Sequence, residues 1–175
     1  MIAIRPATAQ DLPDLRRVAI ETQVATFGSY NTQENLDAFM KEAYSLDNLR
    51  RELTESGSVN YLAVDGLTLA GFMRLRLSNE VEYLLGDNTL ELQRLYVLKK
   101  YHGLKVGATL MEYALRHAMD HKFEWMWLGV WERNFKAQDF YKRWGFERFS
   151  EHVFQMGSDP QTDWLMKRRV LAVGC

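Results

Sequence analysis

The chain of 175 residues, 47% hydrophobic and 26% charged, has the size and composition of a globular protein with a sizeable core. Its formal net charge of −1 argues against nucleic acid or an anionic membrane as the main partner. No stretch reaches the length of a membrane span, and the start lacks the apolar region of a signal peptide. These features predict one domain over residues 1–175, in the cytoplasm. Cys175 is the only cysteine, so no intramolecular disulfide can form, and we expect its thiol to be structurally irrelevant.

The first half of the chain is predicted to hold a strand, three helices and a β-hairpin. Alternating apolar residues mark a short strand near residues 2–4. Thr8 and Asp11 are spaced as in a capping box, and apolar residues at helical spacing then carry a helix to about residue 24. The remaining elements are two short helices starting near Thr32 and Asp47 and a hairpin that turns at Asp65-Gly66.

The second half begins, after a loop through residues 86–88, with a strand over residues 89–98. Strict alternation along it places Glu91, Gln93, Leu95 and Val97 on one face, and Leu92, Arg94, Tyr96 and Leu98 on the other. The elements that follow are a helix carrying Val106 and Leu110, a central strand at 123–131, a helix from Asn134 to about Trp144 ended by Gly145, and strands near 146–156 and 162–170. The order indicates a mixed α/β fold, in which a βαβ unit places two strands parallel.

The turn YHGLKVG, residues 101–107, has the features of an anion site. It lies between a strand and a helix, where N–H groups and the helix dipole stabilise phosphate. Gly103 and Gly107 would let the backbone approach an anion closely, and Lys105 and His102 add protonatable groups. The alternative is an ordinary basic loop before a helix, and the glycine spacing alone leaves both readings open.

The segment WERNFKAQDFYKRWGFE, residues 131–147, is the second feature. Tyr141 on its helix can either pack in the core or donate a proton in a site. Asn134 is well placed to cap the helix.

Together the two features resemble the GNAT superfamily of acetyl-CoA-dependent N-acetyltransferases. The resemblance covers nearly the whole chain and rests on ELQRLYVLKKYHGLKVGATLM and on the spacing of Asn134, Ala137, Phe140-Tyr141 and Gly145-Phe146. The strings TFGSYNTQENLDAF, WLGVWERNFKAQDFYKRWGF and FQMGSDPQTDWLM look like the PaiA-type branch, which is similar to bacterial spermidine/spermine N-acetyltransferases. The resemblance implies a mixed, mostly antiparallel sheet of about seven strands flanked by helices, with a parallel pair at the cofactor cleft.

The resemblance also implies acetyl-CoA as co-substrate, no metal, and direct transfer in a ternary complex. Backbone groups of Leu95, Tyr96 and Val97 would bind the pantetheine arm, and the Val97 N–H would stabilise the oxyanion. Asn134 would also bind pantetheine, and Tyr141 would protonate the leaving thiolate. The residues implied to wrap the pyrophosphate are His102, Gly103, Leu104, Lys105, Val106, Gly107 and Ala108.

Three positions depart from the family pattern. Lys105 stands where a glycine is usual, and His102 replaces a residue that normally donates to phosphate. Gln93 stands where many relatives carry a glutamate that acts as a base through water, and glutamine cannot accept a proton at useful pH. Glu91, two residues earlier, is the nearest replacement, although it fits a solvated strand-end carboxylate equally well.

The expected acceptor is a primary amine of a small molecule, with a polyamine first. Tyr30, Glu34, Glu91 and Gln93 are the residues expected to border it, among acids that also include Glu80, Glu82 and Asp87. Alternatives are an amino acid, an aminoglycoside or a protein N-terminus as acceptor, or a catalytically silent CoA-binding regulatory module. A homodimer is a further expectation from relatives, with Phe149, Phe154 and Trp164 as either interface or core residues.

Overall fold

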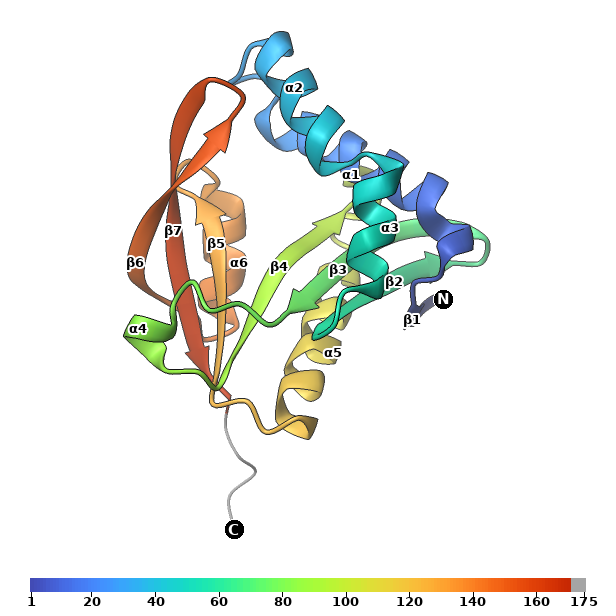
Figure 1. Cartoon of the computed structure of the whole chain (residues 1–175). Coiled ribbons are helices and arrows are strands. Elements are labelled where there is room, and N and C mark those ends of the chain that lie inside the picture. The colour runs from blue at the N-terminus through green and yellow to red at the C-terminus, as the bar shows by residue number, and fades with distance from the viewer. Residues whose placement is uncertain (171–175) are drawn as a thin grey trace.

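The computed structural model describes residues 1–170, so Cys175 lies outside the described part. It confirms the mixed α/β fold: seven strands form one sheet in the order β1-β2-β3-β4-β5-β7-β6, and helices flank it (Figure 1). All neighbouring strands are antiparallel except the pair β4–β5, as the βαβ unit predicts. The strands are β1 (Ile2–Pro6), β2 (Ser58–Asp65), β3 (Thr68–Arg76), β4 (Thr89–Val97), β5 (Trp125–Trp131), β6 (Glu147–Met156) and β7 (Asp159–Arg169).

The helices start close to their predicted caps. The Thr32 side chain accepts from the N–H of Asn35 at 3.2 Å, and Ser45 accepts from Asn48 at 3.1 Å, two residues before the start predicted at Asp47. The helices are α1 (Leu12–Phe27), preceded by a 3-10 turn at Ala9–Asp11, α2 (Gln33–Ala43), α3 (Leu46–Thr54), α4 (Glu82–Leu85), α5 (Val106–Asp120) and α6 (Phe135–Arg143). The short helix α4 is new, since only a loop was expected there.

Two hydrophobic clusters cover the two faces of the sheet. One contains Val106, Leu110 and Met111 of α5 and Tyr141 of α6. The other joins α1, α2 and α3 to β2, β3 and the end of β4, with Leu62 and Phe72 fully buried in it. Burial on this scale stabilises the fold by roughly 1.5–3 kcal/mol for each large apolar side chain.

Strands β4 and β5 separate soon after they meet. Their parallel pairing extends only from Thr89 opposite Trp125 to Glu91 opposite Trp127. Beyond Glu91 the edge of β4 therefore has no strand partner on the β5 side, and the two strands diverge (Figure 1). Unpaired strand edges present free N–H and C=O groups, so this gap can bind an extended chain.

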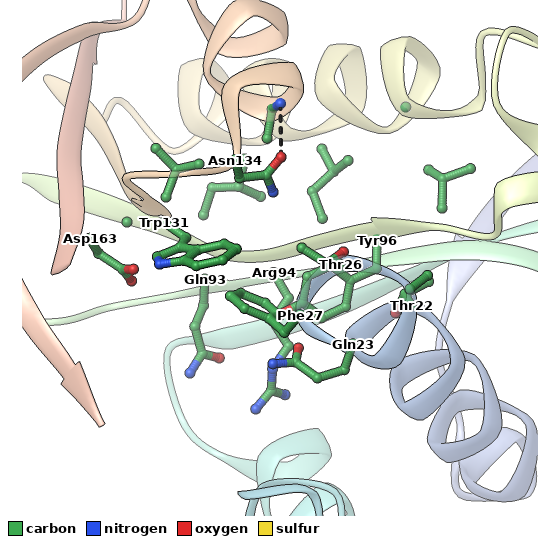
Figure 2. A pocket seen from close by; sticks show the side chains of 18 of the residues that line it. Thr22, Gln23, Thr26, Phe27, Gln93, Arg94, Tyr96, Trp131, Asn134 and Asp163 are labelled. Atoms are coloured by element: carbon green, nitrogen blue, oxygen red, sulfur yellow. Dashed lines mark hydrogen bonds between the residues drawn. The ribbon is translucent and has the colours of Figure 1, made fainter. Parts of the chain in front are cut away.

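A bulge in β4 overturns the predicted alternation of its side chains. Arg74 on β3 pairs with Arg94, but Leu75 pairs with Leu92, so Gln93 is the extra residue. Leu95 and Val97 consequently join Leu92 in the α5 cluster, and Gln93 does not share their face. Gln93 and Arg94 instead point to the same side of the strand, away from Asn134 (Figure 2).

Helix α2 meets the β6–β7 hairpin at the top of the view in Figure 1. The side-chain Oδ1 of Asn35 accepts from the N–H and the hydroxyl of Ser158, both at 3.1 Å. Phe39 packs edge-on against Phe154 with ring centroids 5.3 Å apart. The separation of β4 and β5 is therefore bounded at both of its ends.

Candidate active site

A large cleft lies where β4 and β5 diverge, with α1 on one side and the start of α6 on the other (Figure 2). It has two halves. We call the half beside the 101–107 turn and α6 the cofactor half, and the half beside β6, β7 and the start of β4 the acceptor half. Backbone groups dominate the first half and charged side chains the second.

The edge of β4 offers backbone groups to the cofactor half. The Leu98 N–H donates to the Ala70 carbonyl of β3 at 2.9 Å, so the peptide groups of Val97 point to the opposite edge, into the gap. The Val97 carbonyl accepts from Nε2 of His102 at 2.9 Å. Because β5 pairs with β4 only as far as Glu91, the Val97 N–H has no strand partner on that side within residues 1–170. Leu95, Tyr96 and Val97 all line the cleft, but the same register turns the peptide groups of Tyr96 toward β3 and not into the gap.

The 101–107 turn keeps its glycine-like shape despite the lysine. Lys105 has φ 63° and ψ 10°, in the left-handed region, and Gly103 has φ 83°. For a residue with a side chain this conformation costs roughly 1–2 kcal/mol. Lys105 is the N-cap of α5 and makes no side-chain cap, so the first N–H groups of the helix stay available.

Most of the residues expected at the pyrophosphate do line the cleft. They are His102, Gly103, Lys105, Val106, Gly107 and Ala108. Leu104 does not line the cleft, and its side chain is exposed. His102 is already engaged, because its Nε2 donates to Val97 and its Nδ1 accepts from the ammonium of Lys136 at 3.1 Å. Lys136 on α6, which the sequence analysis did not single out, thus adds a cation beside the turn.

Asn134 caps α6, which is the first of the two roles considered for it. Its Oδ1 accepts from the Ala137 N–H at 3.2 Å, the N-cap bond of α6 drawn in Figure 2. The side-chain amide points into the cleft and, within residues 1–170, donates to no protein group. It can therefore donate to a carbonyl of a bound pantetheine arm.

Tyr141 lies on the cleft wall and is only 9% exposed. Burial, and secondarily Tyr96, raise the pKa of its phenol well above the usual range. The hydroxyl is therefore protonated at neutral pH, as a proton donor requires. Across the described residues it makes no hydrogen bond that would occupy this proton.

These groups fit coenzyme A. The uncapped start of α5 suits a pyrophosphate, the unpaired edge of β4 suits the amides of pantetheine, and Tyr141 lies on the wall of the same cleft. Between residues 1 and 170, no group of three or more His, Cys, Asp or Glu side chains is placed to hold a metal. In the same range, no helix is long and apolar enough to cross a bilayer.

In the acceptor half, Glu91, which was considered for the base, and Gln93 are both engaged. Glu91 is buried, and both of its oxygens accept from Arg76, at 2.5 and 3.3 Å. Burial raises the pKa of its carboxyl, and the Arg76 guanidinium opposes that rise. The side-chain Oε1 of Gln93 accepts from Arg74. Each of these two side chains is therefore already bonded to an arginine.

Tyr30 and Glu34 differ in their placement. Tyr30 lines the cleft and packs edge-on against Trp131, with ring centroids 5.0 Å apart. Phe27 packs against the same indole at 4.9 Å, so three aromatic rings form one wall. Glu34 is exposed on α2 and does not line the cleft, which removes it from the site expected at the acceptor.

The structure brings together a charged cluster that the sequence did not indicate. His152 on β6 contacts Glu80 through Nδ1 and lies 3.5 Å from Asp163 of β7 through Nε2. All three line the cleft. Glu80 was noted only among several acids, and no motif marks His152 or Asp163, because the three are up to 83 positions apart. Only the pairing of β6 with β7 and the path of the β3–β4 connection unite them.

Comparisons with known proteins agree with this cleft. The Acetyltransferase (GNAT) family model matches residues 19–146. The chain is 35% identical to an uncharacterised N-acetyltransferase of Lactobacillus delbrueckii subsp. lactis over 97% of this chain and 98% of that protein. It is 32% identical to the spermidine N(1)-acetyltransferase of Thermoplasma acidophilum over 63% of this chain and 66% of that protein.

Among solved structures, the PaiA N-acetyltransferase of Thermoplasma acidophilum in complex with coenzyme A matches with a TM-score of 0.82 and 26% identity. The match covers 97% of this chain and 99% of that one. The family match, the near full-length relative and the fit of the cleft to coenzyme A agree. The chain belongs to the GNAT family and is an acetyl-CoA-dependent N-acetyltransferase.

Proposed function

We propose that the protein acetylates a primary amine of a small polyamine such as spermidine. The observation that carries this proposal is the acceptor half, where carboxylates of Glu80 and Asp163 lie in the same cleft as the aromatic wall at Trp131. Ammonium groups are stabilised by carboxylates and by aromatic faces. The similarity to a spermidine N(1)-acetyltransferase supports the same acceptor class.

The proposed reaction is direct transfer with both substrates bound. The Val97 N–H would donate to the carbonyl oxygen of the thioester as negative charge develops there. Stabilisation of such a developing charge is usually the largest single contribution to an enzyme's rate enhancement. Tyr141 would give its proton to the departing thiolate sulfur. The turn from His102 to Ala108, together with Lys136 and Asn134, would fix the co-substrate so that the amine attacks along one direction.

A thiol-release assay with acetyl-CoA tests the acceptor class. Spermidine, spermine and putrescine are compared with amino acids, aminoglycosides and a peptide with a free N-terminus. We expect kcat/KM to be at least about tenfold higher for a polyamine, since one good ion pair in a desolvated site is worth roughly 1.4 kcal/mol or more. A higher value for another amine would replace the polyamine. Acetyl-CoA binding without thiol release from any of them would favour a regulatory module.

Assembly and location complete the proposal. We propose a cytoplasmic enzyme, where acetyl-CoA is available, and a homodimer, to be tested by mass measurement in solution. The aromatic residues of the closing strands give no support to the dimer. Phe149 packs beside α4, Phe154 against Phe39, and Trp164 against the α5–α6 core, so each is explained within one chain.

A further inference from the structure

His152 is a histidine of the acceptor half that has no role in the transfer proposed for Val97 and Tyr141. Within residues 1–170, only His102 and His152 among the histidines line the cleft. His102 lies in the cofactor half with both nitrogens engaged. His152 is therefore the one imidazole that an acceptor amine in this half can reach.

Glu80 fixes the orientation of the His152 ring. Its carboxylate contacts Nδ1, so the proton of the neutral ring is held on that nitrogen. Glu80 is itself held in place, because the next residue, Val81, is fully buried against Trp127 and Leu165 beside α4. The result is a carboxylate–imidazole pair whose second nitrogen, Nε2, is left for another partner, the arrangement that orients a general base.

There is room for an amine at Nε2. Asp163 Oδ2 lies 3.5 Å from Nε2, at the long limit of a hydrogen bond. Gly129 of β5 lies next to this pair. Alternation along β5 places it on the same face of the strand as Trp127 and Trp131, between their two side chains. A Cβ on Gly129 would lie 3.5 Å from Nε2 and 3.4 Å from Asp163 Oδ2. The missing side chain leaves a gap at the point where the imidazole and the carboxylate converge.

We propose that the Glu80–His152 pair is the general base that deprotonates the acceptor amine, with Asp163 holding the ammonium beside it. One N–H bond of the ammonium breaks, and its proton passes to Nε2 and then to solvent. The nitrogen lone pair forms the C–N bond to the thioester carbonyl carbon as the C–S bond breaks. After the C–N bond has formed, the nitrogen loses a second proton. This proton returns to the Tyr141 oxygen and replaces the one that Tyr141 gave to the thiolate. The assignment rests on the amine acceptor proposed above, but not on that amine being a polyamine.

The charges around His152 set the pH range in which it acts. Glu80 faces it from the β3–α4 segment and Asp163 from β7, while β5 contributes the uncharged Gly129. The ion-paired Glu91 and Arg76 line the same cleft. Hydrogen bonding first to Asp163 and then to Glu80 outweighs burial and raises the pKa of His152 to about 9. Turnover of an alkylamine should therefore rise with pH up to about 9.

The test compares two acceptors in the full-length enzyme. One is the best alkylamine from the thiol-release assay, which is an ammonium ion near pH 8. The other is a hydrazide, whose amine has a pKa far below 7 and needs no base before it attacks. For His152→Gln we expect kcat with the alkylamine to fall about 100-fold, a typical contribution of a general base, and kcat with the hydrazide to change less than threefold. The acetyl-CoA Kd, measured by calorimetry, should stay within twofold.

Two further variants complete the design. Glu80→Gln should lower alkylamine turnover about tenfold and move the rise of turnover with pH to lower pH, because the imidazole loses one of its carboxylates. His121→Gln, an exposed histidine at the end of α5, is the matched control and should behave as the wild type.

An equal loss with both acceptors, or no loss with the alkylamine, would overturn the assignment. So would an alkylamine-selective loss in Glu91→Gln that His152→Gln lacks, since the base would then be Glu91. Failure of the polyamine proposal shows itself separately, as acetylation of a different amine by the wild type. The same comparison is then made with that amine.

Discussion

The two halves of the cleft are built in different ways. The cofactor half is made by consecutive stretches, the edge of β4, the 101–107 turn and the start of α6, and its main donors are backbone N–H groups. The acceptor half is made by single side chains from four separate places, β4, the β3–α4 segment, β6 and β7. A shared co-substrate needs the same backbone shape in every relative, whereas an acceptor can be changed one side chain at a time. A change in one half of the cleft should therefore leave the other half intact.

The largest effect is expected at Tyr141, on the wall of the cleft. Tyr141→Phe should lower kcat by about 100-fold or more, because a positioned acid contributes roughly 10²–10⁴-fold. The acetyl-CoA Kd should change less than twofold, since the ring that packs in the core is kept. Tyr113→Phe, on the α5 surface beside Tyr61, is the control with the same chemical change. Unchanged turnover in Tyr141→Phe would remove it as the proton donor.

His152 should also make the stability of the fold depend on pH. Its pKa is raised to about 9 from an ordinary value of 6.5. A group with a raised folded pKa stabilises fully below its unfolded pKa, so this contribution is present below about pH 6.5 and is lost as the pH rises through about 9. With partial solvent screening we expect a loss on the order of 1–2 kcal/mol across that window.

Urea unfolding at pH 6 and pH 9.5 measures this loss. In His152→Gln the difference between the two free energies of unfolding should shrink by about the same 1–2 kcal/mol. An identical pH dependence in wild type and variant would mean that Glu80 and Asp163 do not bind the imidazolium.

Gly129 offers a way to obstruct the acceptor half alone. Gly129→Leu would fill the gap between Trp127 and Trp131 beside Asp163. We expect the amine KM to rise about tenfold, with the acetyl-CoA Kd within twofold, because one misplaced or lost ion pair costs roughly 1.4 kcal/mol. Gly107→Ala in the first turn of α5 should do the reverse, weakening acetyl-CoA binding and sparing the amine KM. A rise of both the amine KM and the acetyl-CoA Kd in either variant would contradict the division of the cleft into two halves.

Lys105 is expected to have the smallest effect. Lys105→Gly removes the charge and the left-handed cost together, whereas Lys105→Ala removes only the charge. At low salt both should weaken acetyl-CoA binding about two- to fivefold, and the difference from wild type should vanish at high ionic strength. Lys105→Gly should in addition be more stable than Lys105→Ala by about 1 kcal/mol. Equal stability of the two variants would mean that the turn relaxes when the lysine is replaced.

The cofactor half could be predicted from the sequence better than the acceptor half, because it is made of consecutive stretches. The strand, turn and helix of the cofactor half are local, so periodicity, glycine spacing and motif strings predicted them, and only Leu104 falls outside the cleft. Lys136 was missed because its relation to His102 crosses 34 positions. The β4 alternation was mispredicted because a bulge leaves no mark in composition.

The acceptor half depends on contacts that no local pattern encodes. Glu34 was expected there from its helix and lies outside, while His152 and Asp163 were not considered. Glu91 was foreseen at the right place, but its buried ion pair with Arg76 requires knowing that β3 and β4 are paired in that register.

All the variants above keep the length of the chain. The bulge at Gln93 bears on that length, because Gln93 is an extra residue that lets Leu92 and Leu95 face α5 although they are three positions apart. Deleting Gln93 would leave Leu92 next to Arg94 in regular alternation, so Leu95 and Val97 would still face α5, and Arg94 and Tyr96 would still face the opposite side. Position 93 is therefore open to deletion as well as to substitution. Relatives should carry either the same number of residues or one fewer between Glu91 and the 101–107 turn.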